Sequence, residues 1–138
     1  MLQHRTWWWA AWLLAAIVFD VSAQEICITC HGPGGNSASP GIPSIAGQPK
    51  LFIENQLVLI REELRPSPQM LPVVKGMNDA EITRLAEHFS KLPAKSAETG
   101  QADPRLAQRS IERARALRCG VCHLADFKGQ KQVPRLAA

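Results

Sequence analysis

Residues 27–31 read Cys-Ile-Thr-Cys-His, and a glycine-rich loop leads from them to Ile-Pro-Ser-Ile-Ala-Gly at residues 42–47. The same pattern returns at residues 119–123, which read Cys-Gly-Val-Cys-His, and it leads to Val-Pro-Arg-Leu-Ala-Ala at residues 133–138. The proline of the later segment lies twelve residues past the histidine in the first copy and eleven in the second. A pattern repeated at an offset of about 92 residues predicts two related modules.

The spacing of the cysteines is that of a covalent haem site. Two thiols three positions apart lie on one side of a helical turn, where they can bond the two vinyl groups of one porphyrin. The next residue then projects its imidazole at the iron, and C-x-x-C-H is the attachment signature of c-type haem. The predicted attachment residues are Cys27, Cys30, Cys119 and Cys122, and the predicted axial ligands are His31 and His123.

Three other uses of four cysteines fit the sequence less well. A four-cysteine zinc site needs no histidine after either pair. A thioredoxin-like redox pair needs strands around it, and the sequence predicts almost none. Two disulfides, the first expectation in an exported chain, would leave both histidines unexplained. We therefore interpret both motifs as haem sites.

Residues 1–23 have the composition of a secretory signal peptide. A basic head with His4 and Arg5 precedes an apolar stretch at residues 7–19, and Val-Ser-Ala at 21–23 places the expected cleavage before Gln24. The apolar stretch is shorter than the roughly 20 residues that cross a bilayer as a helix, which disfavours a retained anchor. About 115 residues would remain with a formal charge of +4, and no basic patch carries the aromatic residues of a nucleic-acid site.

The sequence of the first module predicts helices separated by two loops. A short helix is expected over residues 24–30, and an irregular glycine- and proline-rich loop follows it. A second loop, opened by Pro-Ser-Pro at 66–68, holds Met70. Between the loops an amphipathic helix is expected over residues 49–65, with an apolar face at helical spacing. That face consists of Ile53, Leu57, Ile60 and Leu64.

Helix-start signals mark two further segments. Asn78 and Glu81 form a capping box, which predicts a helix that ends before Pro93 and carries a half-exposed His88. Residues 94–103 read as a linker. Asp103 and a first-turn proline then start a helix that leads into the second motif. The arginines at 105, 109 and 113 of this helix form a stripe, which is more typical of a solvated face than of a docking patch.

The first module resembles a class I cytochrome c domain, and the paired arrangement resembles the periplasmic dihaem cytochromes c of bacteria. The resemblance rests on CITCHGPGGNSASPGIPSIAGQ, on Gln69-Met70 and on MNDAEITRLAEHFSKLP. It implies an all-α fold, with about three main helices wrapped around covalent haem. The expected domains are residues 24–93, with the first haem, and residues 104–138, with the second motif.

The resemblance also implies an axial ligand on each side of the first iron. His31 would be the proximal ligand, and a methionine of the second loop would be the distal one. Met70 lies within that loop, whereas Met77 directly precedes the helix cap, where a residue packs as a hydrophobic staple, so we assign Met70. A backbone carbonyl near Pro43 is expected to accept the Nδ1 proton of His31, and Pro134 occupies the corresponding place in the second module.

The second module departs from the family pattern. The sequence stops fifteen residues after His123, and no methionine or histidine follows it. We expect a truncated form of a longer two-haem protein, although the first module or another chain could cover the second haem instead. The sixth ligand of the second haem iron would be water, Lys128, Lys131 or none.

The sequence therefore predicts a periplasmic electron carrier, not an enzyme. Its partners would be redox proteins such as a respiratory complex, an oxidase or a dehydrogenase, with at most peripheral membrane association. The alternative is a haem enzyme, or a gas- or peroxide-binding protein, that uses an open coordination position at the second haem.

Overall fold

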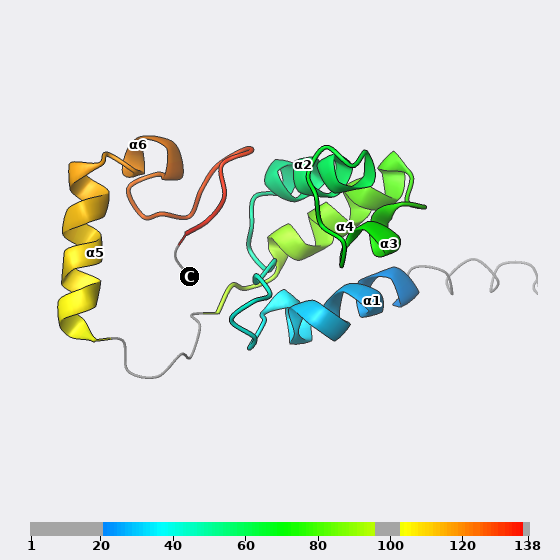
Figure 1. Cartoon of the computed structure of the whole chain (residues 1–138), viewed down its shortest axis with the longest axis horizontal. Coiled ribbons are helices and arrows are strands. Elements are labelled where there is room, and N and C mark those ends of the chain that lie inside the picture. The colour runs from blue at the N-terminus through cyan, green and yellow to red at the C-terminus, as the bar shows by residue number, and fades with distance from the viewer. Residues whose placement is uncertain (1–20, 96–102, 137–138) are drawn as a thin grey trace, which may run out of the picture.

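The structure is a computed structural model that describes residues 21–95 and 103–136 (Figure 1). These residues contain no β-strand, only an isolated bridge between Gln130 and Val133, so the predicted all-α class is confirmed. Residues 1–20 of the predicted signal and 96–102 of the predicted linker lie outside the described residues. The helices are α1 (Val21–His31), the 3-10 turn η1 (Pro33–Gly35), α2 (Lys50–Arg61), α3 (Leu71–Val74), α4 (Asp79–Lys91), α5 (Pro104–Ala116) and α6 (Gly120–His123).

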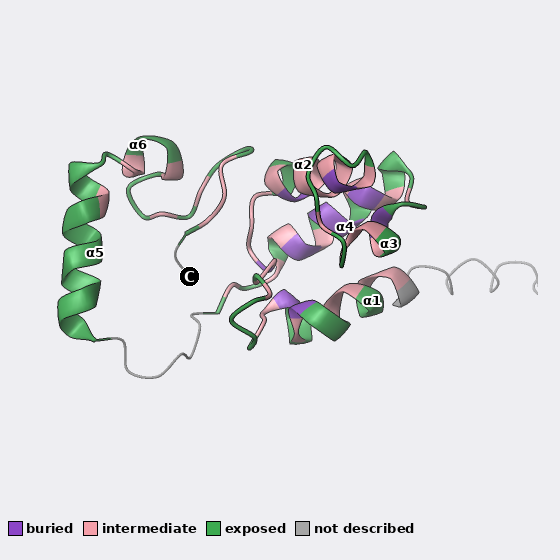
Figure 2. Cartoon of the chain, in the orientation of Figure 1, coloured by how far each residue is buried: buried purple, intermediate pink, exposed green. Residues whose placement is uncertain are grey.

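A small hydrophobic core lies where α2 packs against α4, and α1 lies across it (Figures 1 and 2). Its buried centre consists of Ile53, Leu85, Ala86 and Phe89, with Phe89 only 1% exposed. The apolar side of α1 covers this centre through Ala23, Cys27 and Ile28. The first attachment motif is therefore built into a helix that is itself part of the core.

Helix α1 is longer than the sequence predicts. It begins at Val21 rather than at residue 24 and continues through His31. No glycine or proline interrupts residues 21–31, and Gly32 then ends the helix with a left-handed φ of 79°. The amide of Gly32 still donates to the carbonyl of Ile28 at 2.9 Å, and this bond closes the last turn of the helix, which ends at His31.

Helix α2 ends earlier than predicted. It ends at Arg61, because Glu63 adopts a left-handed φ of 59° that breaks the helical path. Leu64 is consequently 73% exposed, and its assignment to the apolar face of this helix is wrong. The loop that follows also contains the one-turn helix α3, which the sequence did not predict.

The capping box at the start of α4 is present as predicted. The Asn78 side chain accepts the Glu81 amide at 3.0 Å, and the Glu81 carboxylate accepts the Asn78 amide at 2.8 Å. Met77, one residue earlier, packs against the core, in agreement with the staple assignment. His88 is half-exposed and lies edge-on to Phe89, with ring centroids 5.0 Å apart.

Residues 103–136 form a second region, whose first helix begins with the predicted cap. Its helices, α5 and α6, contain no buried residue (Figure 2). Asp103 caps α5 by accepting the Arg105 amide at 2.9 Å, and Pro104 occupies the first turn. The helix stops at Ala116, and Arg118 with a φ of 55° separates it from α6, which carries the second motif. The apolar side chains of α5 are solvent-exposed, apart from the half-buried Ala114.

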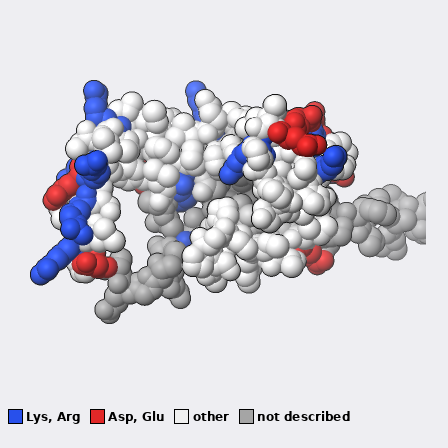
Figure 3. All heavy atoms as spheres, viewed as in Figure 1, with Lys and Arg blue, Asp and Glu red and all other residues white. Residues whose placement is uncertain are grey.

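Charge is distributed unevenly between the two regions. Residues 24–95 hold seven basic and seven acidic side chains, whereas residues 103–136 hold eight basic and three acidic ones. Figure 3 shows the resulting Lys and Arg side chains projecting from the part of the molecule that carries α5. Within the described ranges, no helix has the length and apolar content that a membrane crossing requires.

Candidate functional site

His31 stands at the end of α1 with one ring nitrogen already committed. Its Nδ1 lies 2.8 Å from the backbone oxygen of Pro43, and the residue is 7% exposed. A carbonyl oxygen can only accept, so Nδ1 carries the proton and donates. The lone pair of Nε2 is then free to bind a metal, and the bond at Nδ1 fixes the orientation of the ring.

The loop that presents the Pro43 carbonyl is held by hydrogen bonds of the three residues that follow Pro43. The Gly35 carbonyl accepts the amides of Ile45 and Ala46 at 2.8 and 3.0 Å. The Ser44 hydroxyl accepts the Ser37 amide at 3.0 Å. Because these bonds fix the loop against the turn after His31, the carbonyl that orients the imidazole is itself held in place.

Gly35 is needed at this turn for two reasons. Its φ of 75° lies in the left-handed region, which costs a side-chain-bearing residue free energy. A Cβ at this position would also lie 2.9 Å from Cδ1 of Phe89 and 3.1 Å from Cγ1 of Ile45. The turn after the first motif can therefore pack directly on the core.

The two thiols of the first motif differ in exposure. Cys27 is half-buried against the core, and this burial raises the pKa of its thiol, whereas Cys30 is exposed. All four cysteines are free thiols. Among the described residues, no three His, Cys, Asp or Glu side chains gather closely enough to hold a metal ion together.

The second motif repeats the local geometry of the first. Nδ1 of His123 donates to the Pro134 oxygen, again at 2.8 Å. The amide of Leu136 donates to the Phe127 oxygen at 2.8 Å, as that of Ile45 does to Gly35 in the first module. The pairing of histidine with proline is thus set by the loop and does not need the core.

The repeat extends to the backbone angles. The residue after each histidine has a positive φ, 79° at Gly32 and 67° at Leu124. The fourth residue after each histidine does too, 75° at Gly35 and 56° at Phe127. In the second copy bulky residues occupy positions that glycine fills in the first, and such residues hold this conformation at a cost of about 1–3 kcal/mol each.

The structure places Met70 at the start of α3 and Met77 in the core. Met70 is half-buried, its amide donates to the Ser67 oxygen at 3.1 Å, and its own carbonyl accepts the amides of Val73 and Val74. Met77 instead contacts the core, and its carbonyl accepts from Nη1 of Arg61 at 3.0 Å. The thioether of Met70 is therefore the one that does not pack into the α2–α4 core.

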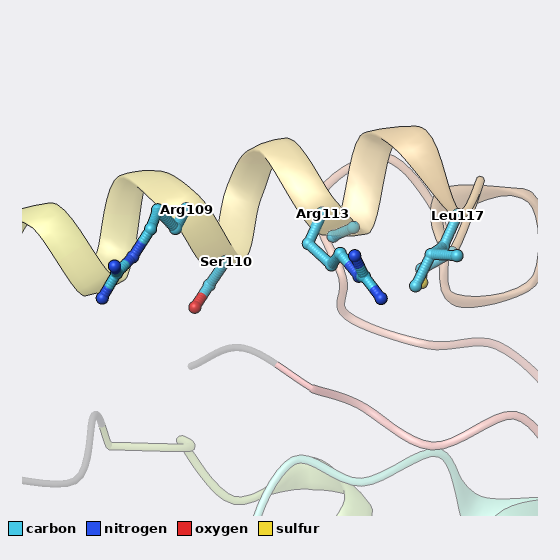
Figure 4. A pocket seen from close by; sticks show the side chains of 6 residues that line it. Arg109, Ser110, Arg113 and Leu117 are labelled. Atoms are coloured by element: carbon cyan, nitrogen blue, oxygen red, sulfur yellow. The ribbon is translucent and has the colours of Figure 1, made fainter.

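An open groove of about 480 Å³ lies along α5 and reaches the second motif (Figure 4). Arg109, Ser110, Arg113 and Leu117 point from the same side of the helix toward the C-terminal segment. Ala114 and Cys119 complete the lining. Two members of the predicted arginine stripe thus line the same groove as an attachment cysteine.

Sequence reasoning did not identify Gln48 and Arg135 as partners. The side-chain amide of Gln48 pairs with the backbone of Arg135, 87 residues away. No motif marks either residue in the sequence. The only signal is indirect, because Arg135 directly follows the proline of the second repeat.

The donor set in each motif fits haem c. Each site offers two free thiols three positions apart and one imidazole whose Nδ1 is committed to a carbonyl, which leaves Nε2 for iron. This is the arrangement that covalent attachment and axial ligation require.

Comparisons with known proteins agree with this reading. No protein-family model matches the chain. A cytochrome c4 from Thiocapsa roseopersicina is 33% identical over 129 residues, which cover 86% of this chain and 65% of that protein. The chain thus spans less than two thirds of the length of this curated relative.

Two solved structures share the fold. Reduced recombinant cytochrome c4 from Pseudomonas stutzeri superposes with a TM-score of 0.73 at 27% identity, over 83% of this chain and 70% of that one. Cytochrome c4 from Acidithiobacillus ferrooxidans gives 0.70 at 30% identity, over 83% and 73%. With the helical fold and the two C-x-x-C-H sites, these likenesses define a class I c-type cytochrome. The chain belongs to the cytochrome c4 family.

Proposed function

We propose that this protein carries single electrons between redox proteins through covalently bound haem and catalyses no reaction of its own. The observation that supports this most directly is the repeated bond of a motif histidine to a proline carbonyl, at 2.8 Å in both modules. Membership of the cytochrome c4 family supports it independently.

In this proposal the first module holds its haem from three directions. Cys27 and Cys30 would attach it, and His31, through Nε2, and Met70 would bind its iron. When bound, haem c supplies an iron that alternates between the ferric and ferrous states. The Pro43 carbonyl accepts the Nδ1 proton of His31 and keeps its ring in one orientation.

Rigid ligands suit electron transfer because little has to move when the charge changes. His31 is buried and hydrogen-bonded, and α1, which carries it, packs on the core. The exposed side of the site is at Cys30, where a partner can approach the haem edge. Weak, transient contact is sufficient for such an exchange.

The second module would hold a further haem through Cys119, Cys122 and His123. We place the protein in the periplasm. The segment at residues 1–23 would direct its export to that compartment. Its partners would be a respiratory complex, an oxidase or a dehydrogenase. The basic excess of residues 103–136 favours an acidic partner surface.

Haem stoichiometry and ligand binding test this function. The purified full chain should retain two haems per polypeptide after denaturation, and the reduced protein should exchange electrons rapidly with a small redox protein. Haem that extracts into acidic organic solvent would contradict covalent attachment. Peroxide turnover that disappears in His123→Ala would instead favour the enzyme alternative.

A pair of methionine variants tests the distal ligand. The oxidised protein should show the weak near-infrared band of sulfur–iron ligation, and Met70→Ala should remove it. Met77→Ala is the matched control, which should keep the band and lose about 1–2 kcal/mol of stability, because full burial of Met contributes roughly 1.5–3 kcal/mol and Met77 is half-buried. If only Met77→Ala removed the band, the assignment would be reversed.

A further inference from the structure

Gln48 joins the two modules by a two-point hydrogen bond. Its Oε1 accepts the backbone amide of Arg135 at 2.9 Å, and its Nε2 donates to the backbone oxygen of the same residue at 3.4 Å. A backbone N–H only donates and a carbonyl only accepts, so the two contacts determine which way the side-chain amide points. One glutamine thus pairs with Arg135 as a neighbouring strand would.

The residue held in this way is directly bonded to the acceptor of the second histidine. The Pro134 carbonyl and the Arg135 amide belong to one peptide unit, which is planar and, like all described peptide bonds, not cis. In a trans unit the C=O and N–H point in opposite directions. The carbonyl side receives Nδ1 of His123 at 2.8 Å, and the amide side is bound by Gln48.

The other end of this connection is anchored in the first core. Gly47, the residue before Gln48, donates its amide to the Phe89 oxygen at 2.9 Å. A Cβ on Gly47 would lie 3.3 Å from Nη1 of Arg135, so the arginine side chain also lies close over this position. The backbone that carries Gln48 is therefore fixed by Phe89, one of the large, fully buried residues of the first module.

We propose that Gln48 is a positioning residue for the second haem site, which acts through the Pro134–Arg135 peptide on His123. The inference rests on the proposed attachment of haem at Cys119 and Cys122. Gln48 holds the peptide plane so that its carbonyl faces the imidazole, and it also fixes the second site relative to the first.

The hydrogen bonds on the two ends of one peptide unit strengthen each other. Acceptance of the Arg135 proton by Gln48 polarises the unit and makes the Pro134 oxygen a better acceptor. A stronger bond at Nδ1 would make the His123 imidazole a stronger electron donor to iron, which would favour the ferric state. Loss of Gln48 should therefore raise the reduction potential of the second iron and leave the first unchanged.

The first module supplies an internal control for this effect. Ser44 occupies the position of Arg135 in the first repeat, one residue after the proline. Its loop is held by contacts within its own module, through Gly35 and Ser37. Removal of the Gln48 amide should therefore act on His123 and not on His31.

The experiment compares Gln48→Leu, Gln48→Glu and the control Gln56→Leu in the full-length holoprotein. Gln56 makes its hydrogen bond to the side chain of Arg65 within the first module. Haem content is measured first. Two readouts follow: hydrogen exchange at the Arg135 and Leu136 amides, and the potential of each haem from its shifted NMR resonances in a redox titration.

In the wild type both amides should be protected. Gln48→Leu should speed exchange at Arg135 by about two- to tenfold, the factor expected for one hydrogen bond, and leave Leu136, which donates to Phe127, unchanged. The potential of the second haem alone should rise. Gln48→Glu retains the acceptor for Arg135 and should restore protection, whereas Gln56→Leu should resemble the wild type.

The outcomes separate this inference from the proposed function. A wild type with one haem would contradict the two-haem proposal and the inference with it. Two haems with an unprotected Arg135 amide in the wild type, or an unchanged second potential in Gln48→Leu, would overturn the inference alone. Equal shifts of both potentials would also overturn it, because they would indicate a general loss of structure.

Discussion

The haem motifs of the two modules have the same local geometry, but their histidines are buried to very different extents. In each, Nδ1 of the motif histidine donates to a proline carbonyl at 2.8 Å. Yet His31 is buried at the end of a helix that packs on the core, whereas His123 is half-exposed beside helices without a buried residue. The ligand geometry is therefore a property of the motif and its loop, while stability comes from the helices packed behind them.

The largest expected effect is the removal of an attachment pair. Cys27→Ala with Cys30→Ala should abolish the first haem and unfold the first module, because the haem would supply part of the core that α1 covers. Cys119→Ala with Cys122→Ala should remove one haem and leave α1 to α4 folded. Haem staining of denatured protein and circular dichroism melts measure both effects. Equal loss of helix in the two double variants would contradict the comparison.

A smaller effect is expected when apolar side chains are shortened in each region. Phe89→Ala should lower the free energy of unfolding by about 3–5 kcal/mol, as for large-to-small changes at fully buried aromatics. Leu117→Ala, at a position that is 62% exposed, should change it by less than about 0.5 kcal/mol. Denaturant unfolding of the holoprotein is the measurement. A cost of several kcal/mol at Leu117 would mean that something covers the α5 face in solution.

The smallest effect is expected at the helix caps. Asn78→Ala removes one half of a capping box in the folded core and should cost about 1 kcal/mol. Asp103→Ala removes the cap of an exposed helix and should lower the helix content without shifting the main unfolding transition. Thermal melts monitored at the haem band and in the far ultraviolet separate the two. A shift of the haem-monitored melt by Asp103→Ala would show that α5 is coupled to the first core.

Much of the first module could be predicted because its signals are local. The capping box at Asn78 and Glu81, the staple position of Met77 and the proline-terminated helix α4 follow from residues within one or two turns of each other. The exposed Leu64 was mispredicted for the opposite reason. Its apolar spacing continues that of the helix, but α2 ends at Arg61, and the left-handed φ of Glu63 turns the chain away before Leu64.

By itself the sequence determined the chemistry: two C-x-x-C-H motifs, each with a proline at the right distance to orient its histidine. Such relations span few residues, so periodicity and spacing can express them. Only the tertiary structure revealed the pairing of Gln48 with Arg135, and the contrast between the buried α4 and the exposed α5. These depend on chain segments that meet across 87 residues or fail to meet at all, and no local pattern records which surfaces come together.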